Sequence, residues 1–65
     1  MNERDKILEF TISEFECYKI ALRKYGQSEE VTKMYRTSWE TLVKLCKELD
    51  IPWHEEYKAR HELYS

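Results

Sequence analysis

Two histidines near the carboxyl end are the first residues whose type could do chemistry in this chain of 65 residues. His54 and His61 are seven positions apart, which places them on roughly the same side of a helix. Metal-binding histidine pairs on helices are usually three or four positions apart, and no cysteine or carboxylate completes a four-ligand set at a known spacing. The aromatic residues around His61 favour a place at the edge of a core. We therefore expect no metal and no cofactor.

Glu14 is an acidic residue on the apolar side of the first helical pattern. Its neighbours at helical spacing are Ile7, Phe10, Tyr18 and Ala21. A carboxylate buried there could act as an acid–base group. A side chain that reaches water at a seam, or accepts a hydrogen bond, is the simpler interpretation, because no second catalytic group is visible beside it. The pattern therefore favours a Glu14 side chain that lies at a seam between helices. Whether the side chain is buried stays open.

Cys17 and Cys46 could form a disulfide only if the fold brought them together. If a helical hairpin bends near residue 27, Cys46 lies about 13 Å further along the hairpin than the residue level with Cys17. A disulfide needs Cα atoms within about 7 Å of each other. We therefore expect two free thiols.

An enzyme is not expected from the remaining residues. A phosphate-binding loop needs several glycines, and this chain has one. No Ser/His/Asp or Cys/His set has a supporting spacing. An enzyme centred on Glu14 would need a convergent partner group that the sequence does not show.

Four basic residues form a stripe on the second helical pattern. They are Lys33, Arg36, Lys44 and Lys47. Such a stripe could contact phosphates, but a solvated helix face is the more common origin of this pattern. The net charge of −2 argues against a nucleic-acid partner, and acids at the start of the last helix argue against a helix-turn-helix. A nucleic-acid accessory factor is kept as the alternative function.

Gly26, the only glycine, marks the bend around which the chain is organised. It follows the basic residues Arg23 and Lys24, which suit the negative end of a helix dipole. Glycine adopts the left-handed backbone that often ends a helix. Ser28 is predicted as the N-cap of the next helix, ahead of two glutamates. We predict a helix over 3–25, a turn over 26–28 and a helix over 29–49.

Pro52, the only proline, marks a second break. The residue before a proline is pushed away from helical geometry, so the second helix should stop by Ile51. Proline suits the first position of a new helix. We predict a break over 50–52 and a helix over 53–64. Its aromatic face carries Trp53, Tyr57, His61 and Tyr64, with Leu63 further round.

These helices predict one all-α domain over residues 1–65. The apolar side of each long helix covers about half of its circumference, which is more than one neighbour can cover. A second copy is the simplest cover, since two-fold dimers are the commonest assembly. The predicted fold is a long antiparallel helical hairpin plus a short third helix, forming a dimeric helical bundle. The alternative is a compact three-helix monomer whose aromatic residues fill one core.

The predicted function is a small non-enzymatic module that associates with itself and binds or regulates an unknown protein partner. Its expected interface is made of large apolar side chains. They are Ile12, Phe15, Trp39, Val43, Trp53 and Tyr57. This expectation assumes that the third helix does not bury them within its own chain. No stretch approaches the roughly 20 apolar residues that cross a bilayer, and no signal peptide is seen, so a cytoplasmic location is expected.

Overall fold

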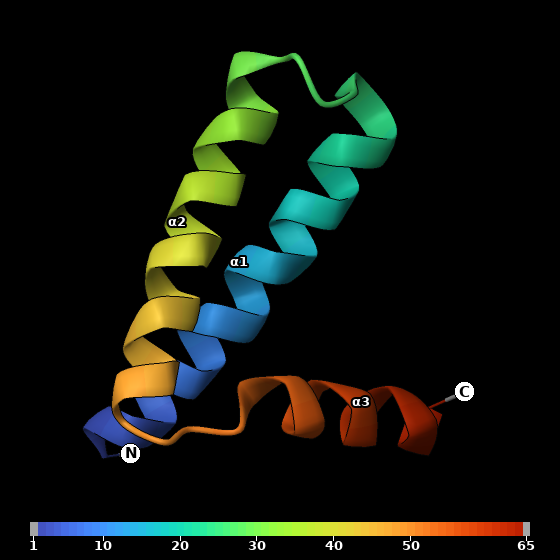
Figure 1. The fold of residues 1–65 in the computed structure, drawn as a ribbon. Helices are drawn as coiled ribbons and strands as arrows, with labels where there is room; N and C mark the ends of the chain where they lie inside the picture. Colours follow the sequence, from blue (N-terminus) through green and yellow to red (C-terminus); the bar gives the residue numbers. More distant parts are fainter. Residues whose placement is uncertain (1, 65) are drawn as a thin grey trace.

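Three α-helices make up the described part of the chain, which is residues 2–64, with side chains described through residue 62. In this computed structural model they are α1 (Glu3–Tyr25), α2 (Glu30–Glu48) and α3 (Trp53–Tyr64). Figure 1 shows α1 and α2 side by side and joined at one end, with α3 lying crosswise at the other end. The all-α class, the hairpin and the short third helix are confirmed. Helix α2 is shorter than predicted by one residue at each end.

Asn2 caps the start of α1. Its side-chain oxygen accepts a hydrogen bond from the backbone N–H of Asp5 at 2.8 Å. Glu3 and Asp5 add negative charge at the positive end of the helix dipole. The predicted caps do not include Asn2, although an asparagine followed three positions later by an acid is a recognisable helix start.

Gly26 ends α1 in a backbone conformation that is nearly restricted to glycine. Its φ of 87° is positive as predicted, but its ψ of 171° lies outside the left-handed helical region. The chain is therefore extended at Gly26, and α2 begins one residue later than predicted, at Glu30. The predicted N-cap at Ser28 is wrong, because Glu29 occupies that position and its side chain makes no capping hydrogen bond.

Short side chains hold the two long helices together. Thr11 and Cys46 are almost completely buried where they meet, with the Oγ1 and Sγ atoms 3.2 Å apart. The Thr11 hydroxyl donates to the carbonyl oxygen of Ile7 at 2.7 Å. A hydroxyl has one proton to donate, so the Cys46 thiol must be the donor between the two side chains. Nearer the bend, the Thr32 hydroxyl donates to the carbonyl oxygen of Ala21 at 3.3 Å, and small residues at both places allow a close approach of the helices.

The carboxyl end of α2 closes with a Schellman motif. Asp50 has a φ of 55°, in the left-handed region. The Ile51 N–H donates to the carbonyl oxygen of Cys46 at 2.8 Å, and the Asp50 N–H donates to that of Lys47 at 3.4 Å. Ile51 keeps only 5% of its surface exposed, so it supplies the apolar contact that often accompanies this motif.

Arg4, in the first turn of α1, also caps the end of α2. Its guanidinium donates to the carbonyl oxygens of Leu49 and Asp50, at 3.1 and 2.8 Å. The last carbonyls of a helix lack partners within it, and positive charge suits this end of the dipole. The contact ties the start of α1 to the segment that leads into α3.

Pro52 sets the start of α3. The predicted stop before Pro52 is confirmed, and the Pro52 carbonyl accepts a hydrogen bond from the N–H of Glu56 at 3.1 Å. Helix α3 begins at Trp53, the first residue of the predicted helix, and Pro52 directly precedes it. The predicted facing of Leu63 and Tyr64 lies outside the described side chains. Over the described residues, none of the helices has the length and apolar character required to pass through a membrane.

Candidate functional site

Four aromatic side chains from all three helices pack together in what we call the aromatic cluster. They are Phe15, Trp39, Trp53 and Tyr57. The Phe15 ring stacks on Trp39 with the centroids 4.9 Å apart, and it meets the rings of Trp53 and Tyr57 edge-on at 5.3 and 5.0 Å. Offset and edge-on geometries are the favourable ones for ring pairs. Ring contacts therefore hold α3 against the hairpin.

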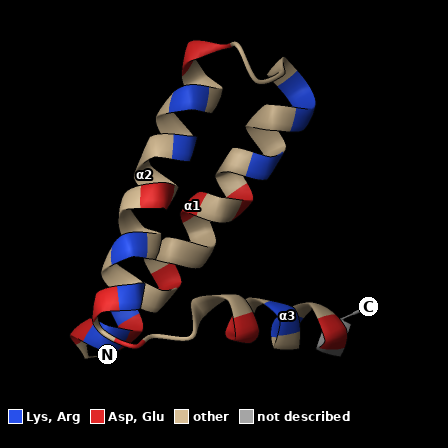
Figure 2. Ribbon diagram, viewed as in Figure 1, with Lys and Arg blue, Asp and Glu red and all other residues tan. Residues whose placement is uncertain are grey.

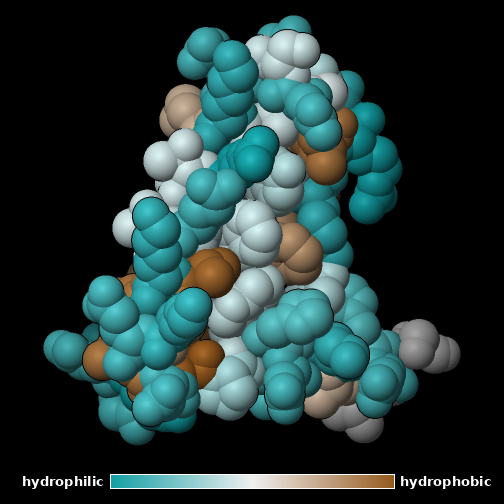
Figure 3. All heavy atoms as spheres, in the orientation of Figure 1, coloured by the Kyte–Doolittle hydropathy of each residue, from teal (hydrophilic) through white to brown (hydrophobic). Residues whose placement is uncertain are grey.

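All six predicted interface residues lie on this side of the hairpin or on α3. Ile12 is buried, Val43 lines a shallow hollow beside Trp53, and none of the six is exposed. Figure 3 shows weakly polar and hydrophobic side chains along the groove of the hairpin, with α3 across its lower end. Helix α3 thus packs on the face that was predicted to meet a partner. Binding of another chain by these residues stays a prediction.

An ion pair fastens α3 to α1 beside the aromatic cluster. The Arg60 guanidinium donates to both carboxylate oxygens of Glu9, one of them at 3.1 Å, and its Nε lies 3.4 Å from Glu56. The hydrogen bond from Arg60 lowers the pKa of the Glu9 carboxyl, against the opposing effect of burial. The same hydrogen bond raises the pKa of Arg60.

Polar side chains of α1 and α3 meet at the edge of the aromatic cluster. The Lys19 ammonium donates to the Tyr57 hydroxyl and lies 5.1 Å from the centre of the Phe15 ring. The His61 ring packs on Tyr57 with the centroids 4.2 Å apart, and its Nε2 lies 3.2 Å from a Glu16 carboxylate oxygen. His61 is exposed and lies at the outer edge of the aromatic cluster, against Tyr57.

The other candidate ligands stay apart. Among the described residues, no three histidine, cysteine, aspartate or glutamate side chains gather closely enough to hold a metal ion. Cys17 and Cys46 are free, as predicted. Cys46 meets Thr11. Thr11 is six residues from Cys17 and therefore about 9 Å away along the helix.

The opposite side of the hairpin carries an exposed apolar surface, which we call the open face. Its large apolar side chains, at the centre and the rim, are Phe10, Ile20, Tyr25, Met34, Leu45 and Leu49. Phe10 is two positions from the buried Ile12, which is about 200° round α1. Leu45 is likewise two positions from Val43 on α2. None of the exposed large apolar residues comes from the described part of α3.

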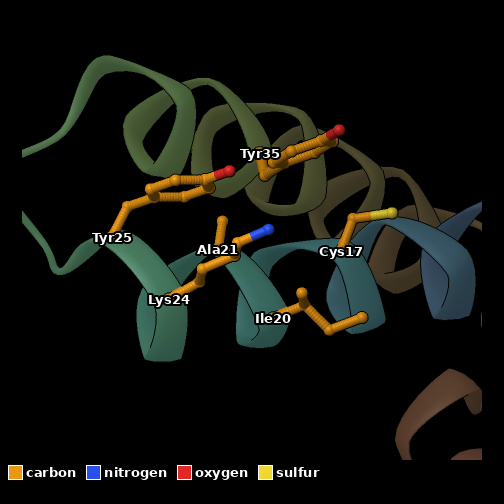
Figure 4. A pocket seen from close by; sticks show the side chains of 6 residues that line it. All are labelled: Cys17, Ile20, Ala21, Lys24, Tyr25 and Tyr35. Carbon is orange, nitrogen blue, oxygen red and sulfur yellow. The ribbon is translucent and has the colours of Figure 1, made fainter.

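A shallow hollow lies on the open face near the bend. Its volume is about 180 Å³, and it is lined by Cys17, Ile20, Ala21, Lys24, Tyr25 and Tyr35. Figure 4 shows Tyr25 of α1 and Tyr35 of α2 with the small Ala21 side chain between them, and Ile20 and Cys17 further along α1. An apolar side chain from another molecule could enter between the rings. The sequence pattern does not reveal this hollow, because Tyr35 comes from a different helix than the other five residues.

Glu14 lies one turn from Phe10, on the side of α1 that contributes to the open face. It is half-buried, and it forms no hydrogen bond or ion pair with any described residue. The side chain therefore lies at a seam in the surface rather than in the core. A partner that covers the open face would have to accommodate this carboxylate.

The basic stripe of α2 is exposed along its whole length. The Arg36 Nε donates to the Glu40 carboxylate at 2.8 Å, and this hydrogen bond raises the pKa of Arg36. One of the four positive charges is therefore partly offset within the helix. A role of the stripe in nucleic-acid binding stays a prediction.

The comparisons with known proteins show no relationship for this chain. Neither a protein-family model, nor a curated protein, nor a solved structure matches it.

Proposed function

We propose that the protein is a small non-enzymatic interaction module that associates with itself through the open face. One observation carries the proposal: the large apolar side chains left exposed in the described chain all come from the hairpin. Phe10 and Met34 keep 61% and 66% of their surface in contact with water. Monomers rarely expose apolar surface that extends over two helices without using it to bind.

The energy available from this surface is large enough to drive association. Burying a large apolar side chain completely is worth roughly 1.5 to 3 kcal/mol, so a half-exposed one still offers about 1 kcal/mol. A symmetric dimer buries every such residue twice. Association costs roughly 4 to roughly 15 kcal/mol in lost freedom. The free energy gained by burying these side chains and the free energy cost of association are of similar size. The fraction of assembled protein should therefore change measurably with protein concentration.

Sedimentation equilibrium over a wide concentration range tests this proposal. We expect the molar mass to rise from one chain towards two as the concentration increases. Phe10→Gln should shift this rise to concentrations about tenfold higher, because it removes the most exposed ring of the open face. Lys44→Gln is the matched control, since Lys44 is exposed on the polar side of α2. A wild-type mass of one chain at every concentration would contradict self-association.

A further inference from the structure

We propose that two copies pair with α1 of each copy on α2 of the other, so that the two-fold axis runs along the hairpin. This inference rests on the proposed self-association and adds its arrangement. It is carried by four exposed charges at the rim of the open face, which we call the rim charges. They are Lys6 and Lys24 on α1 and Glu30 and Glu48 on α2.

Helical spacing places these charges along the two outer edges of the open face. Lys6 is four positions before Phe10, about 40° round α1, and Lys24 is eighteen positions after Lys6, which is five full turns. Glu48 is three positions after Leu45, about 60° round α2 in the direction away from α1. Glu30 is eighteen positions before Glu48 and shares its edge. One edge of the open face is therefore basic and the other acidic.

At the bend, a basic and an acidic rim charge lie at the same level. The contact between Ala21 and Thr32 fixes the register of the hairpin there. Lys24 is three residues from Ala21 towards the bend, and Glu30 is two residues from Thr32 in the same direction. The positions of Lys24 and Glu30 along the hairpin axis therefore differ by about 1.5 Å. Figure 2 shows the basic end of α1 and the acidic start of α2 at this end of the hairpin.

At the other end of the hairpin, a basic and an acidic rim charge again lie at similar positions along the hairpin axis. The contact between Thr11 and Cys46 fixes the register. Lys6 is five residues from Thr11 away from the bend, and Glu48 is two residues from Cys46 in that direction. Their levels differ by about 4.5 Å, less than one helical turn. Long flexible side chains can span this difference.

The rim charges distinguish the two symmetric ways of placing one hairpin on another. When the axis runs along the hairpin, the basic edge of each copy meets the acidic edge of the other at equal levels. Lys6 then faces Glu48, and Lys24 faces Glu30, each twice. When the axis runs across the hairpin, lysines face lysines and glutamates face glutamates. Opposite charges attract and like charges repel, so the first arrangement is favoured.

The apolar residues at the two edges support the same arrangement. Ile20 on the basic edge and Met34 on the acidic edge are 56% and 66% exposed. Ile20 is one residue from Ala21 away from the bend, and Met34 is two residues from Thr32 in that direction. They would meet at nearly the same level across the two copies. Two apolar side chains that the monomer leaves in water would then cover each other.

Within one chain the rim charges are available for these contacts. Lys6, Glu30 and Glu48 form no ion pair with any described residue, and Lys24 lies over the Tyr25 ring at 5.4 Å from its centre. The resulting assembly is a four-helix bundle in which neighbouring helices are antiparallel. Helix α3 of each copy lies on the outer side, because it packs on the opposite side of its hairpin.

Charge reversal tests the arrangement. Lys6→Glu replaces two attractive contacts per dimer with two repulsive ones, so the dissociation constant from sedimentation equilibrium should rise about tenfold. Glu48→Lys should have the same effect. The double variant restores opposite charges and should return the constant to near the wild-type value. Lys58→Glu, at an exposed site on α3, carries the same change in net charge as Lys6→Glu and should leave the constant unchanged.

The crosswise arrangement gives the opposite result. There, Lys6→Glu would place a negative charge opposite Lys24 of the second copy and would tighten the dimer. Tighter or unchanged association of Lys6→Glu would therefore overturn this arrangement and leave self-association standing. A wild-type chain that stays monomeric would overturn the proposed function itself. Circular dichroism of each variant checks that the helices are retained.

Discussion

Asp50 holds a left-handed backbone conformation that glycine adopts more readily. It also places a negative charge at the negative end of the α2 dipole. Its carbonyl accepts from Arg4, and its N–H takes part in the Schellman motif, so the backbone is needed there while the side chain is not. The position therefore keeps a residue that the local geometry does not favour.

Asp50→Gly should stabilise the protein by roughly 0.5 to 1 kcal/mol, because glycine relieves the backbone strain and removes the unfavourable charge. The midpoint of urea unfolding, followed by circular dichroism, measures this change. Asp50→Ala is the control, because alanine removes the charge and keeps the strain. Equal stabilisation by both variants would show that the charge matters and the backbone conformation does not.

Single residues also show where sequence reasoning succeeds and fails. Gly26 and Pro52 end helices for steric reasons that hold in any context, so both breaks could be predicted. Ser28 is a good N-cap by type, but the N-cap position of α2 is occupied by Glu29, one residue further along the chain. The Schellman motif is usually recognised by its glycine, so one built on Asp50 carries no such signal.

Helix α3 is the element that gives the two sides of the hairpin different roles. It packs on one side through rings and is fastened at its edge by Arg60 and Glu9. Ile12 and Phe15 are three positions apart, so helical spacing places them on the same side of α1. Spacing cannot say what covers that side. Which element covers that side depends on the direction of the chain after Ile51. The Schellman motif and Arg4 together set this direction.

The ion pair between Arg60 and Glu9 predicts a pH dependence of stability. Arg60 lowers the pKa of Glu9 in the folded chain. The pair therefore stabilises above the ordinary glutamate pKa of about 4.3. This stability is lost as the pH falls through the lower folded value. Both side chains are partly in water, so we expect about 0.5 kcal/mol.

Thermal unfolding of Glu9→Gln and wild type at a series of pH values measures this contribution. At neutral pH the variant should be less stable, and the difference should disappear in acid once Glu9 is protonated in the folded wild type. Glu9→Gln made in an Arg60→Gln background is the control and should show no such difference, because the ion pair is already absent there. A difference between Glu9→Gln and wild type that persists unchanged in acid would argue against the ion pair as its cause.

The hairpin has two apolar sides, and within a single chain only one of these sides is covered. The sequence predicted broad apolar surfaces on both long helices, each needing more than one neighbour. The structure supplies α3 as the second neighbour for one side and leaves the open face exposed. Within the proposed assembly, Glu14 is the residue that fits the open face least well.

Glu14→Gln should therefore tighten self-association. Covering the open face would remove water from a carboxylate that has no partner within the described chain, and an amide is less costly to bury than a charge. We expect the dissociation constant to fall roughly fivefold, measured by sedimentation equilibrium. Glu55→Gln on α3 removes the same charge outside the open face and should have no effect. Weaker association of Glu14→Gln would mean that the second copy supplies a donor to this carboxylate.

The aromatic cluster has a practical consequence for spectroscopy. The chain contains two tryptophans, Trp39 on α2 and Trp53 on α3, and their rings meet edge-on with the centroids 5.9 Å apart. Indole fluorescence and near-ultraviolet dichroism therefore report whether α3 is docked, without any added label. The open face holds tyrosines and no tryptophan. Indole emission thus follows movement of α3 with no tryptophan signal from the open face, whereas phenol emission combines the tyrosines of the open face with Tyr57 of the aromatic cluster.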